Sequence, residues 1–322
     1  LIPCAETVHF FKCGSDTTTA AVRLARIFTG REKVVRWGYN GWHDWACIRD
    51  AGISPKVREV VLTFRYNDLD SLEDVLKRNR DKVACVIMMP LEIEIPHPGF
   101  LSGVRDLAHR YGALFILDEM RSGFHLALGG AQEYYGVTPD LATFSKAIAN
   151  GYAISVLAGR RDIMETISQT YFSSGFYTNS LSMATAVATI KKLQQKRIID
   201  HLWRIGQGLI DGLNELAEDV GVEAAAVGIS PMPFLVFTDA DPEVREAARH
   251  IFYSETTRRG ILFHPNHHWF VSASHTEQDL DHTLDICEGA FRLVKKELAR
   301  GYRAPTGISG RDVGVADDTV VD

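Results

Sequence analysis

VACVIMM (83–89), FLSGVRDLAHRYG (100–112) and ALFILDE (113–119) are the consecutive segments that decide the fold class of this chain. The first and third are continuously apolar, as strands are when helices cover both faces of a parallel sheet. The middle segment is amphipathic and ends at Gly112, a residue type that commonly terminates helices. Together they predict one βαβ unit.

The same alternation of strand-like and helical runs extends through the first two-thirds of the chain. It predicts an α/β fold with a mostly parallel sheet flanked by helices. Further runs of this kind are a strand at 8–12, a turn at 13–16, a helix at 17–30, a strand at 139–144 and helices at 181–196 and 198–219.

From about residue 221 the pattern changes. Strand-like PFLVFT (233–238) and VSAS (271–274) are separated by helical segments near 242–259 and 277–299, which predicts a smaller C-terminal α/β domain. We therefore expect a large domain over 1–220 and a small domain over 221–300. Residues 301–322 are polar and Gly-rich, and we expect a flexible tail there.

Composition excludes several classes of protein. The net charge is −6 and no Lys/Arg-rich run occurs, so neither nucleic acid nor a membrane surface is expected as a partner. No apolar run approaches the ~20 residues that span a bilayer. The five cysteines form no C-x-x-C pair, which predicts free thiols in a reducing, cytoplasmic environment.

Gly14, Ser15 and Asp16 lie where a strand passes into a helix. Backbone N–H groups at a helix N-terminus, with a hydroxyl beside them and a glycine that permits close approach, can bind phosphate. The alternative is that Ser15 or Asp16 only caps the helix.

Charged residues follow two apolar strands. Asp118 and Glu119 stand at the end of ALFILDE, where a carboxylate needs a positive partner: a protonated pyridine nitrogen, a metal or an internal Arg or Lys. Lys146 follows PDLATF (139–144) among small and apolar residues, which would lower its pKa and let it attack a carbonyl, unless it is simply solvated.

Aromatic residues gather at 37–45. This cluster could stack on a flat ring, or it could be core packing. It contains Trp37, Tyr39, Trp42 and Trp45.

Five stretches of the chain are similar to successive motifs of the class III aminotransferases, within the branch that contains glutamate-1-semialdehyde aminomutase. They are GSDTTTAAVRLARIFTGREKVV (14–35), YNGWHD (39–44), GALFILDEMRSGF (112–124), PDLATFSKAIANGY (139–152) and VSASHTEQDLD (271–281). The resemblance implies fold type I and the cofactor pyridoxal 5′-phosphate (PLP).

The resemblance also implies roles for individual residues. Lys146 would hold PLP as a Schiff base and move a proton, and Asp118 would pair with the ring nitrogen. Tyr39 and Met120 would cover the two faces of the ring. Gly14 and Ser15 would hold the phosphate.

Several positions depart from the family pattern. Asn40 replaces the usual histidine, and Gly175 replaces a phosphate-binding threonine, a contact for which Ser174 or Thr178 could substitute. His125 stands where an arginine is common. Asn40, His125 and His268 are the candidates for substrate contact.

The aminomutase glutamate is absent from HPNHHWFVSASH (264–275), which disfavours a true glutamate-1-semialdehyde aminomutase. Four histidines in this region, His264, His267, His268 and His275, have no trusted metal-ligand spacing, and no metal site is expected.

The sequence thus predicts a biosynthetic PLP-dependent aminotransferase that moves an amino group from a donor to a keto or aldehyde acceptor through a Lys146 Schiff base. The alternative is a PLP-dependent aminomutase or racemase of the glutamate-1-semialdehyde aminomutase type. A non-catalytic protein on this fold is the remote alternative. We expect a homodimer, and we expect that the N-terminal segment found in relatives is missing from this chain.

Overall fold

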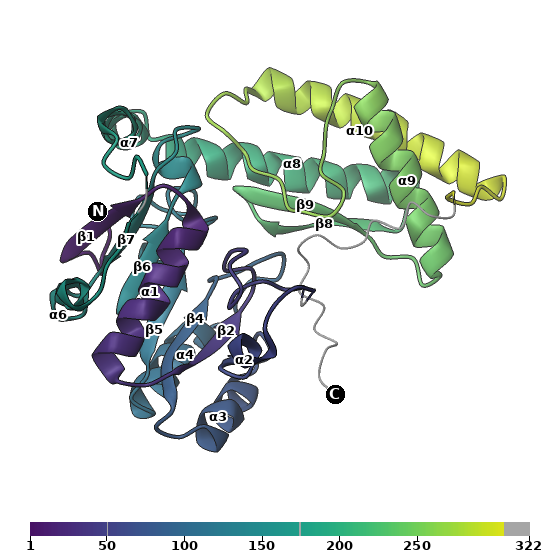
Figure 1. The fold of residues 1–322 in the computed structure, drawn as a ribbon. Helices are drawn as coiled ribbons and strands as arrows, with labels where there is room; N and C mark the ends of the chain where they lie inside the picture. Colours follow the sequence, from purple (N-terminus) through teal and green to yellow (C-terminus); the bar gives the residue numbers. More distant parts are fainter. Residues whose placement is uncertain (50, 174, 306–322) are drawn as a thin grey trace. The chain divides into compact units, whose positions relative to one another are not determined.

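The computed structural model describes residues 1–49, 51–173 and 175–305, and they divide into two compact units. The first comprises Leu1–Leu91 and Pro96–Ile199, and the second comprises Glu92–Ile95 and residues 200–305. Figure 1 shows the course of the chain. Of the predicted tail, residues 306–322 lie outside the described part.

The first unit is built on a seven-stranded sheet of order β1-β7-β6-β5-β4-β2-β3. The strands from β3 to β6 run parallel, whereas β7 is antiparallel to both of its neighbours. The predicted mostly parallel sheet is therefore confirmed. The bounds are β1 (Thr7–Phe11), β2 (Lys33–Trp37), β3 (Val61–Thr63), β4 (Val83–Met88), β5 (Leu114–Asp118), β6 (Leu141–Phe144) and β7 (Ser155–Gly159).

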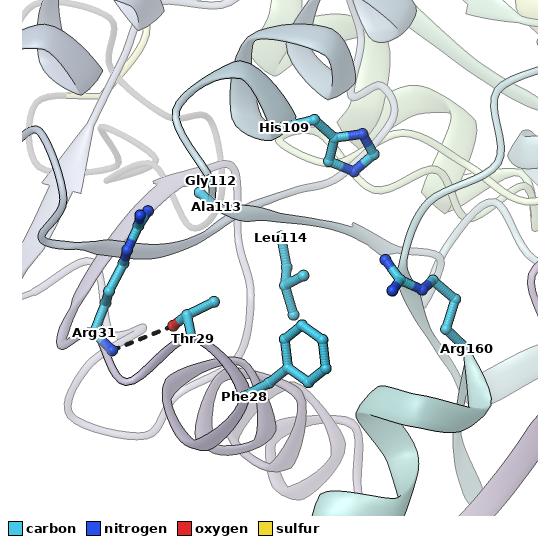
Figure 2. A pocket seen from close by; sticks show the side chains of 8 residues that line it. All are labelled: Phe28, Thr29, Arg31, His109, Gly112, Ala113, Leu114 and Arg160. Carbon is cyan, nitrogen blue, oxygen red and sulfur yellow. Dashed lines mark hydrogen bonds between the residues drawn. The ribbon is translucent and has the colours of Figure 1, made fainter.

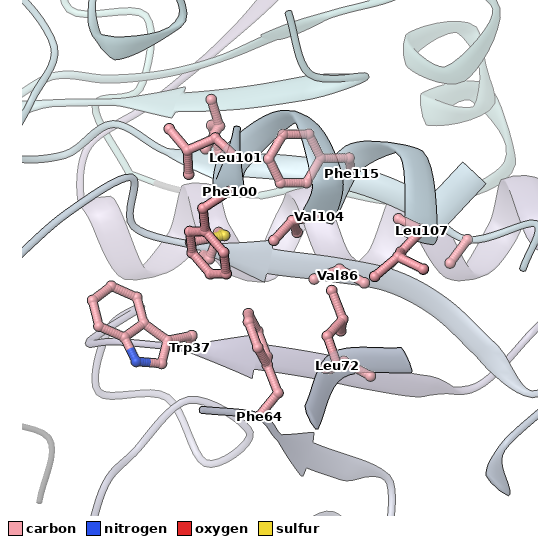
Figure 3. Close-up of a cluster of buried hydrophobic side chains, with 14 of the residues drawn as sticks. Trp37, Phe64, Leu72, Val86, Phe100, Leu101, Val104, Leu107 and Phe115 are labelled. Atoms are coloured by element: carbon pink, nitrogen blue, oxygen red, sulfur yellow. The ribbon is translucent and has the colours of Figure 1, made fainter. Parts of the chain in front are cut away.

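Alternate side chains of the central strands enter two separate cores. Val86 and Met88 of β4 pack with α3 (Leu69–Arg78) and α4 (Phe100–Arg110), in the core shown in Figure 3. Cys85 and Ile87 of the same strand pack on the other face with α1 (Gly14–Thr29). Burial on both faces explains why β4 is a continuous apolar run.

Shorter helices complete this unit. They are α2 (Pro55–Arg58), α5 (Ala131–Tyr134), the 3₁₀ helices η1 (Lys146–Ile148) and η2 (Glu165–Gln169), α6 (Arg161–Met164) and α7 (Ser180–Gln195).

The second unit has its own core. The antiparallel pair β8 (Ala224–Ile229) and β9 (Met232–Phe237) packs with α8 (Ile198–Val220), α9 (Pro242–Arg258) and α10 (Glu277–Ala299). Phe252 and Phe291 are fully buried at its centre. Within the described part of the chain, no helix is long and apolar enough to cross a membrane.

Three local predictions were wrong. α1 begins at Gly14 after the N-cap residue Cys13, so neither Ser15 nor Asp16 is the cap. The segment 271–274 is not a strand. The backbone N–H groups of Trp269 and Val271 donate to the Pro233 and Pro231 oxygens, and this short pairing does not continue through 272–274. β8 was missed, since its sequence AAAVGI lacks the large side chains that mark a strand.

Candidate functional site

One edge of the first unit's sheet collects most of the predicted site residues. β2, β5 and β6 are parallel, so the residues that follow their last positions lie at the same edge. Tyr39 and Asn40 follow β2, Asp118 ends β5, and Lys146 follows β6. β1 runs in the same direction as β6, because each is antiparallel to β7, and it delivers the start of α1 to this edge.

Asp118 is buried, with 1% of its surface exposed. Its Oδ2 accepts a hydrogen bond from Asn40 Nδ2 at 3.0 Å, and its Oδ1 accepts from the backbone N–H of Met120 at 3.2 Å and from Thr143 Oγ1 at 3.3 Å. Burial raises the pKa of Asp118, while these donors and the charge of Lys146 act in the opposite direction. Since these three hydrogen-bond donors are neutral, this carboxylate is suited to receive a cation.

Lys146 opens the 3₁₀ helix η1 with a φ of 49°, a left-handed conformation that is costly for a residue with a side chain. The side chain is accessible to solvent but crowded by protein on its other sides. Loss of hydration lowers the pKa of Lys146, and the positive charge of Arg121 lowers it further, against the opposing effect of Asp118. The amine is therefore easier to deprotonate than an ordinary lysine.

His125 lies within electrostatic reach of Lys146. Burial lowers the pKa of His125 to about 4, so its imidazole is neutral at physiological pH. A neutral ring is a poor partner for a substrate carboxylate, and the predicted substrate role gains no support from this charge state.

The first turn of α1 has the features of an anion site. Among the described residues, the side chain of Cys13 makes no capping hydrogen bond, which leaves the first N–H groups of the helix without a side-chain acceptor. Ser15 Oγ accepts from the backbone N–H of Trp42 at 3.2 Å. A Cβ on Gly14 would lie 2.9 Å from Met120 Sδ, so Met120 packs directly against this turn.

The aromatic cluster divides between core and surface. Trp37 stacks on Tyr66 with ring centroids 3.9 Å apart, and Trp45 is buried in the core beneath α1. Tyr39 and Trp42 keep 40% and 66% of their surfaces exposed. Of these four residues, Tyr39 and Trp42 offer ring faces to a ligand. Trp37 and Trp45 instead match the alternative of core packing.

Glu119 is not equivalent to its neighbour Asp118. Its carboxylate accepts from the backbone N–H groups of Ala131 and Gln132 and from Ser122 Oγ, at 2.6, 3.1 and 2.8 Å. It thus holds the start of α5 and has a structural position.

For the other predicted residues, the structure gives at most their local surroundings. Thr178 is exposed in the turn before α7, and Ser174 lies outside the described residues. His268 belongs to the second unit, where it is 3% exposed in a cavity of about 740 Å³ whose wall includes Phe263 and Trp269.

The structure adds residues that the sequence did not single out. Gly41, with a φ of 117°, passes so close to α1 that a Cβ there would lie 2.7 Å from Ser15 Oγ. Thr18 Oγ1 donates to the backbone oxygen of Asn40 at 2.7 Å. The glycine directly after Tyr39 and Asn40 was the signal that could have revealed the first of these close contacts.

A second hollow, of about 320 Å³, lies at the opposite edge of the sheet, beside the start of β5 (Figure 2). The charged side chains that line this hollow already have partners. Arg31 Nη1 donates to the backbone oxygen of Tyr111 at 2.7 Å. Arg160 Nη1 and His109 Nε2 contact Asp140 at 2.7 and 2.8 Å. These contacts give the hollow a structural role. No cluster of three or more potential metal ligands occurs within residues 1–49, 51–173 and 175–305.

Comparisons with known proteins agree with this arrangement. Residues 1–228 match the family model for class-III aminotransferases. The chain is 40% identical, over 92% of its length and 74% of the relative, to 3-aminobutyryl-CoA aminotransferase of Cloacimonas acidaminovorans. It is 32% identical, over 91% of its length and 76% of the relative, to glutamate-1-semialdehyde 2,1-aminomutase of Desulfatibacillum aliphaticivorans.

Among solved structures, the PLP internal aldimine form of FumI from Sphingopyxis sp. MTA144 superposes with a TM-score of 0.88 at 29% identity. The alignment covers 92% of this chain and 73% of that protein.

The residues of the first unit fit PLP. Asp118 offers a buried carboxylate for a protonated ring nitrogen, α1 offers an uncapped N-terminus for a phosphate, and Lys146 offers an amine of lowered pKa. Asn40 Oδ1 is buried and has no hydrogen-bond partner among the described residues, as expected of a group that faces a ligand.

Proposed function

Because the chain belongs to the class III aminotransferase family and is a PLP-dependent aminotransferase of fold type I, we propose that Lys146 is the residue that carries PLP. The observation that carries this proposal is the placement of a buried carboxylate, Asp118, within electrostatic reach of a lysine of lowered pKa at the carboxyl edge of the sheet.

The other site residues have roles that follow from their positions. Asp118 would pair with the protonated ring nitrogen, and its hydrogen-bond donors would favour its ionised form. Gly14 and Ser15 bind the phosphate at the start of α1, Tyr39 covers one face of the ring, and Met120 covers the other. Ser174 or Thr178 of a second subunit completes the phosphate site.

PLP, when bound, supplies an electron sink that stabilises negative charge at the substrate carbon that bears nitrogen. Lys146 attacks the carbonyl of an incoming aldehyde and afterwards takes up and returns the proton of that substrate carbon. The crowded surroundings of its amine favour the neutral form, which both roles require.

We propose a β-amino acyl thioester as the substrate class. The 40% identity to a 3-aminobutyryl-CoA aminotransferase extends over 92% of the chain, which supports this choice. The net reaction exchanges the amino group of a donor for the oxygen of a 3-oxoacyl thioester, so the donor leaves as a keto compound and no external oxidant is needed.

The second candidate is an aminomutase, which the 32% identity to glutamate-1-semialdehyde 2,1-aminomutase favours. The two functions differ in one measurable quantity. A transaminase consumes one separate amino donor for each product, whereas a mutase needs none. Donor consumption with 3-oxobutyryl-CoA as acceptor supports the first candidate, and turnover of glutamate 1-semialdehyde without a donor supports the second.

The attachment of PLP has a direct test. Purified protein reconstituted with PLP should absorb in the violet and, after borohydride reduction, should carry the label on the peptide that contains Lys146. Lys146→Ala should lose the label, while Lys56→Ala, a change of an exposed lysine in α2, should keep it. Labelling of another lysine, or no PLP in the wild type, would overturn the proposal.

We further propose a cytoplasmic homodimer. Large apolar side chains are exposed along the segment that leads into α7, and such patches mark interfaces. They are Tyr171, Phe176, Leu181 and Val187, with exposed fractions of 82%, 80%, 60% and 52%. The five free cysteines support a reducing compartment. Light scattering should give twice the chain mass, and Leu181→Asp should reduce it.

The domain bounds predicted from the sequence remain proposals: a large PLP-binding domain over 1–220 and a small domain over 221–300. Limited proteolysis near residue 220 would test them.

A further inference from the structure

Asn40 is held between α1 and the end of β5. Its backbone oxygen accepts from Thr18 Oγ1 at 2.7 Å, and its side-chain Nδ2 donates to Asp118 Oδ2 at 3.0 Å. With 1% of its surface exposed, the residue belongs to the interior of the site and not to its rim.

The orientation of the Asn40 amide follows from its partner. An ionised carboxylate can only accept hydrogen bonds, so the group facing Asp118 must be the NH₂ and not the oxygen. The amide oxygen Oδ1 then points elsewhere, and it is buried without a hydrogen-bond partner among the described residues. An unsatisfied buried acceptor costs free energy, and a ligand that donates to it would recover that cost.

Asn40 is also the strongest donor to Asp118. Its hydrogen bond is shorter than those from the Met120 N–H, at 3.2 Å, and from Thr143 Oγ1, at 3.3 Å. Those two donors contact Oδ1, whereas Asn40 contacts Oδ2. Without it, Oδ2 would be buried with no hydrogen-bond donor among the described residues.

We propose that Asn40 is a positioning residue of the cofactor site: its Nδ2 orients and ionises Asp118 for the ring nitrogen, and its Oδ1 accepts a hydrogen bond from the bound cofactor or substrate. This inference rests on the proposed function, because it presumes that Asp118 meets the PLP ring. It adds a positioning role to the substrate contact that the sequence indicated for Asn40.

A neutral donor at this position has a chemical advantage. A cation in place of Asn40 would compete with the ring nitrogen for Asp118. An ionised acid at this position would repel the Asp118 carboxylate. The other ionisable groups within electrostatic reach of Asp118 are Lys146 and Tyr39, and Arg121 acts on both of them. Any pH effect must therefore be separated from the titration of Lys146 and Tyr39.

The experiment measures the PLP dissociation constant of cofactor-free wild type, Asn40→Asp and Asn40→Ala between pH values of about 5 and 8. At neutral pH we expect both variants to bind PLP about tenfold more weakly or worse, since each loses a hydrogen bond to a charged group. Thr143→Val removes the longer bond to Asp118 and should have a smaller effect in the same direction.

The pH profile separates positioning from simple structural support. Asn40→Asp should regain affinity relative to the wild type as the pH falls, because a protonated carboxyl group at position 40 can again donate to Asp118. Asn40→Ala has no such group, and its deficit should stay constant with pH. Division by the wild-type value removes the pH dependence that Lys146 and Tyr39 contribute equally to all three proteins.

Thermal unfolding of the cofactor-free proteins serves as the control for folding, and Asn40→Ala provides the comparison if Asn40→Asp fails to fold. Wild-type affinity in both variants, or equal pH dependence of the two, would overturn the inference while borohydride labelling of Lys146 still supports the proposed function. If the wild type binds no PLP at all, the proposed function itself fails.

Discussion

Glu119 Oε2 accepts a hydrogen bond from the backbone N–H of Ala131 at 2.6 Å, which ties the acid beside Asp118 to the start of α5. Gln132 adds two more donors, its backbone N–H and its side-chain Nε2, both at 3.1 Å from Oε1. Gln132 in turn accepts from the backbone N–H of Cys4 at 2.8 Å. Two adjacent acids thus differ in function, because one is surrounded by fixed backbone donors and the other faces the site.

Glu119→Gln should lower stability while leaving PLP attachment intact. The new amide would place an NH₂ group against N–H donors, at a cost of about 2–3 kcal/mol in the free energy of unfolding. Urea unfolding of the cofactor-free protein measures this cost, with Glu165→Gln, an exposed change, as the control. Loss of PLP labelling at unchanged stability would contradict the structural role.

The rate of PLP uptake should reveal the lowered pKa of Lys146. Only the neutral amine attacks the aldehyde, so the rate should rise with pH and level off below the ordinary lysine value of 10.5. Stopped-flow absorbance of cofactor-free protein mixed with PLP gives the profile. A rate that keeps rising through that value would show that the amine is not perturbed. Arg121→Gln removes one of the two causes and should move the profile to higher pH.

Gly41→Ala should damage the start of α1. The added Cβ would lie 2.7 Å from Ser15 Oγ and 3.1 Å from Ser15 Cα, at a backbone φ of 117° that disfavours any side chain. We expect a loss of about 1–3 kcal/mol in stability together with weaker PLP binding. Gly136→Ala is the matched control, since Gly136 also has a positive φ but nothing lies within 4 Å of its Cβ position. Equal effects of the two changes on PLP affinity would refute a specific role for the contact with Ser15.

Asp140 should be a main source of stability at the opposite edge of the sheet. It is 3% exposed and accepts from the backbone N–H of Phe115 at 2.8 Å, besides its contacts with His109 and Arg160. Figure 2 labels the side chains of His109 and Arg160. Asp140→Ala should cost about 2–4 kcal/mol, because it leaves the buried N–H of Phe115 without this acceptor and removes the contacts with His109 and Arg160.

The control for Asp140 is Asp162→Ala, which removes the exposed partner of the same Arg160 and should cost about 1 kcal/mol or less. Denaturant unfolding measures both. Similar losses in the two variants would mean that burial does not set the contribution of Asp140.

The sequence predicted the sheet well because β4 and β5 are buried on both faces and have no polar residue until Asp118. It could not predict that β7 runs antiparallel, since SVLAG has the same apolar character in either direction. The strand expected at 271–274 failed for a related reason. A β-branched residue among small polar ones is compatible with a strand, but pairing depends on a partner distant in sequence.

The candidate site could be proposed from the sequence by residue type but not in detail. Asp118 and Lys146 became candidates because of their places after apolar strands, and the family resemblance suggested a role for Tyr39. The contact between Asn40 and Asp118 joins residues 78 positions apart and depends on which end of an amide faces a carboxylate. No local pattern encodes such a choice.

The short connection that carries Lys146 joins two neighbouring antiparallel strands, β6 and β7, and Ser145 Oγ closes its base by donating to the Ile154 oxygen at 2.8 Å. Both ends of this loop are therefore anchored in the same hydrogen-bonded ladder. In terms of hydrogen exchange, the amides on either side of the lysine should open only when that part of the sheet opens. The Lys146 side chain can therefore change rotamer, while hydrogen bonds at both ends of the loop hold the backbone that carries it.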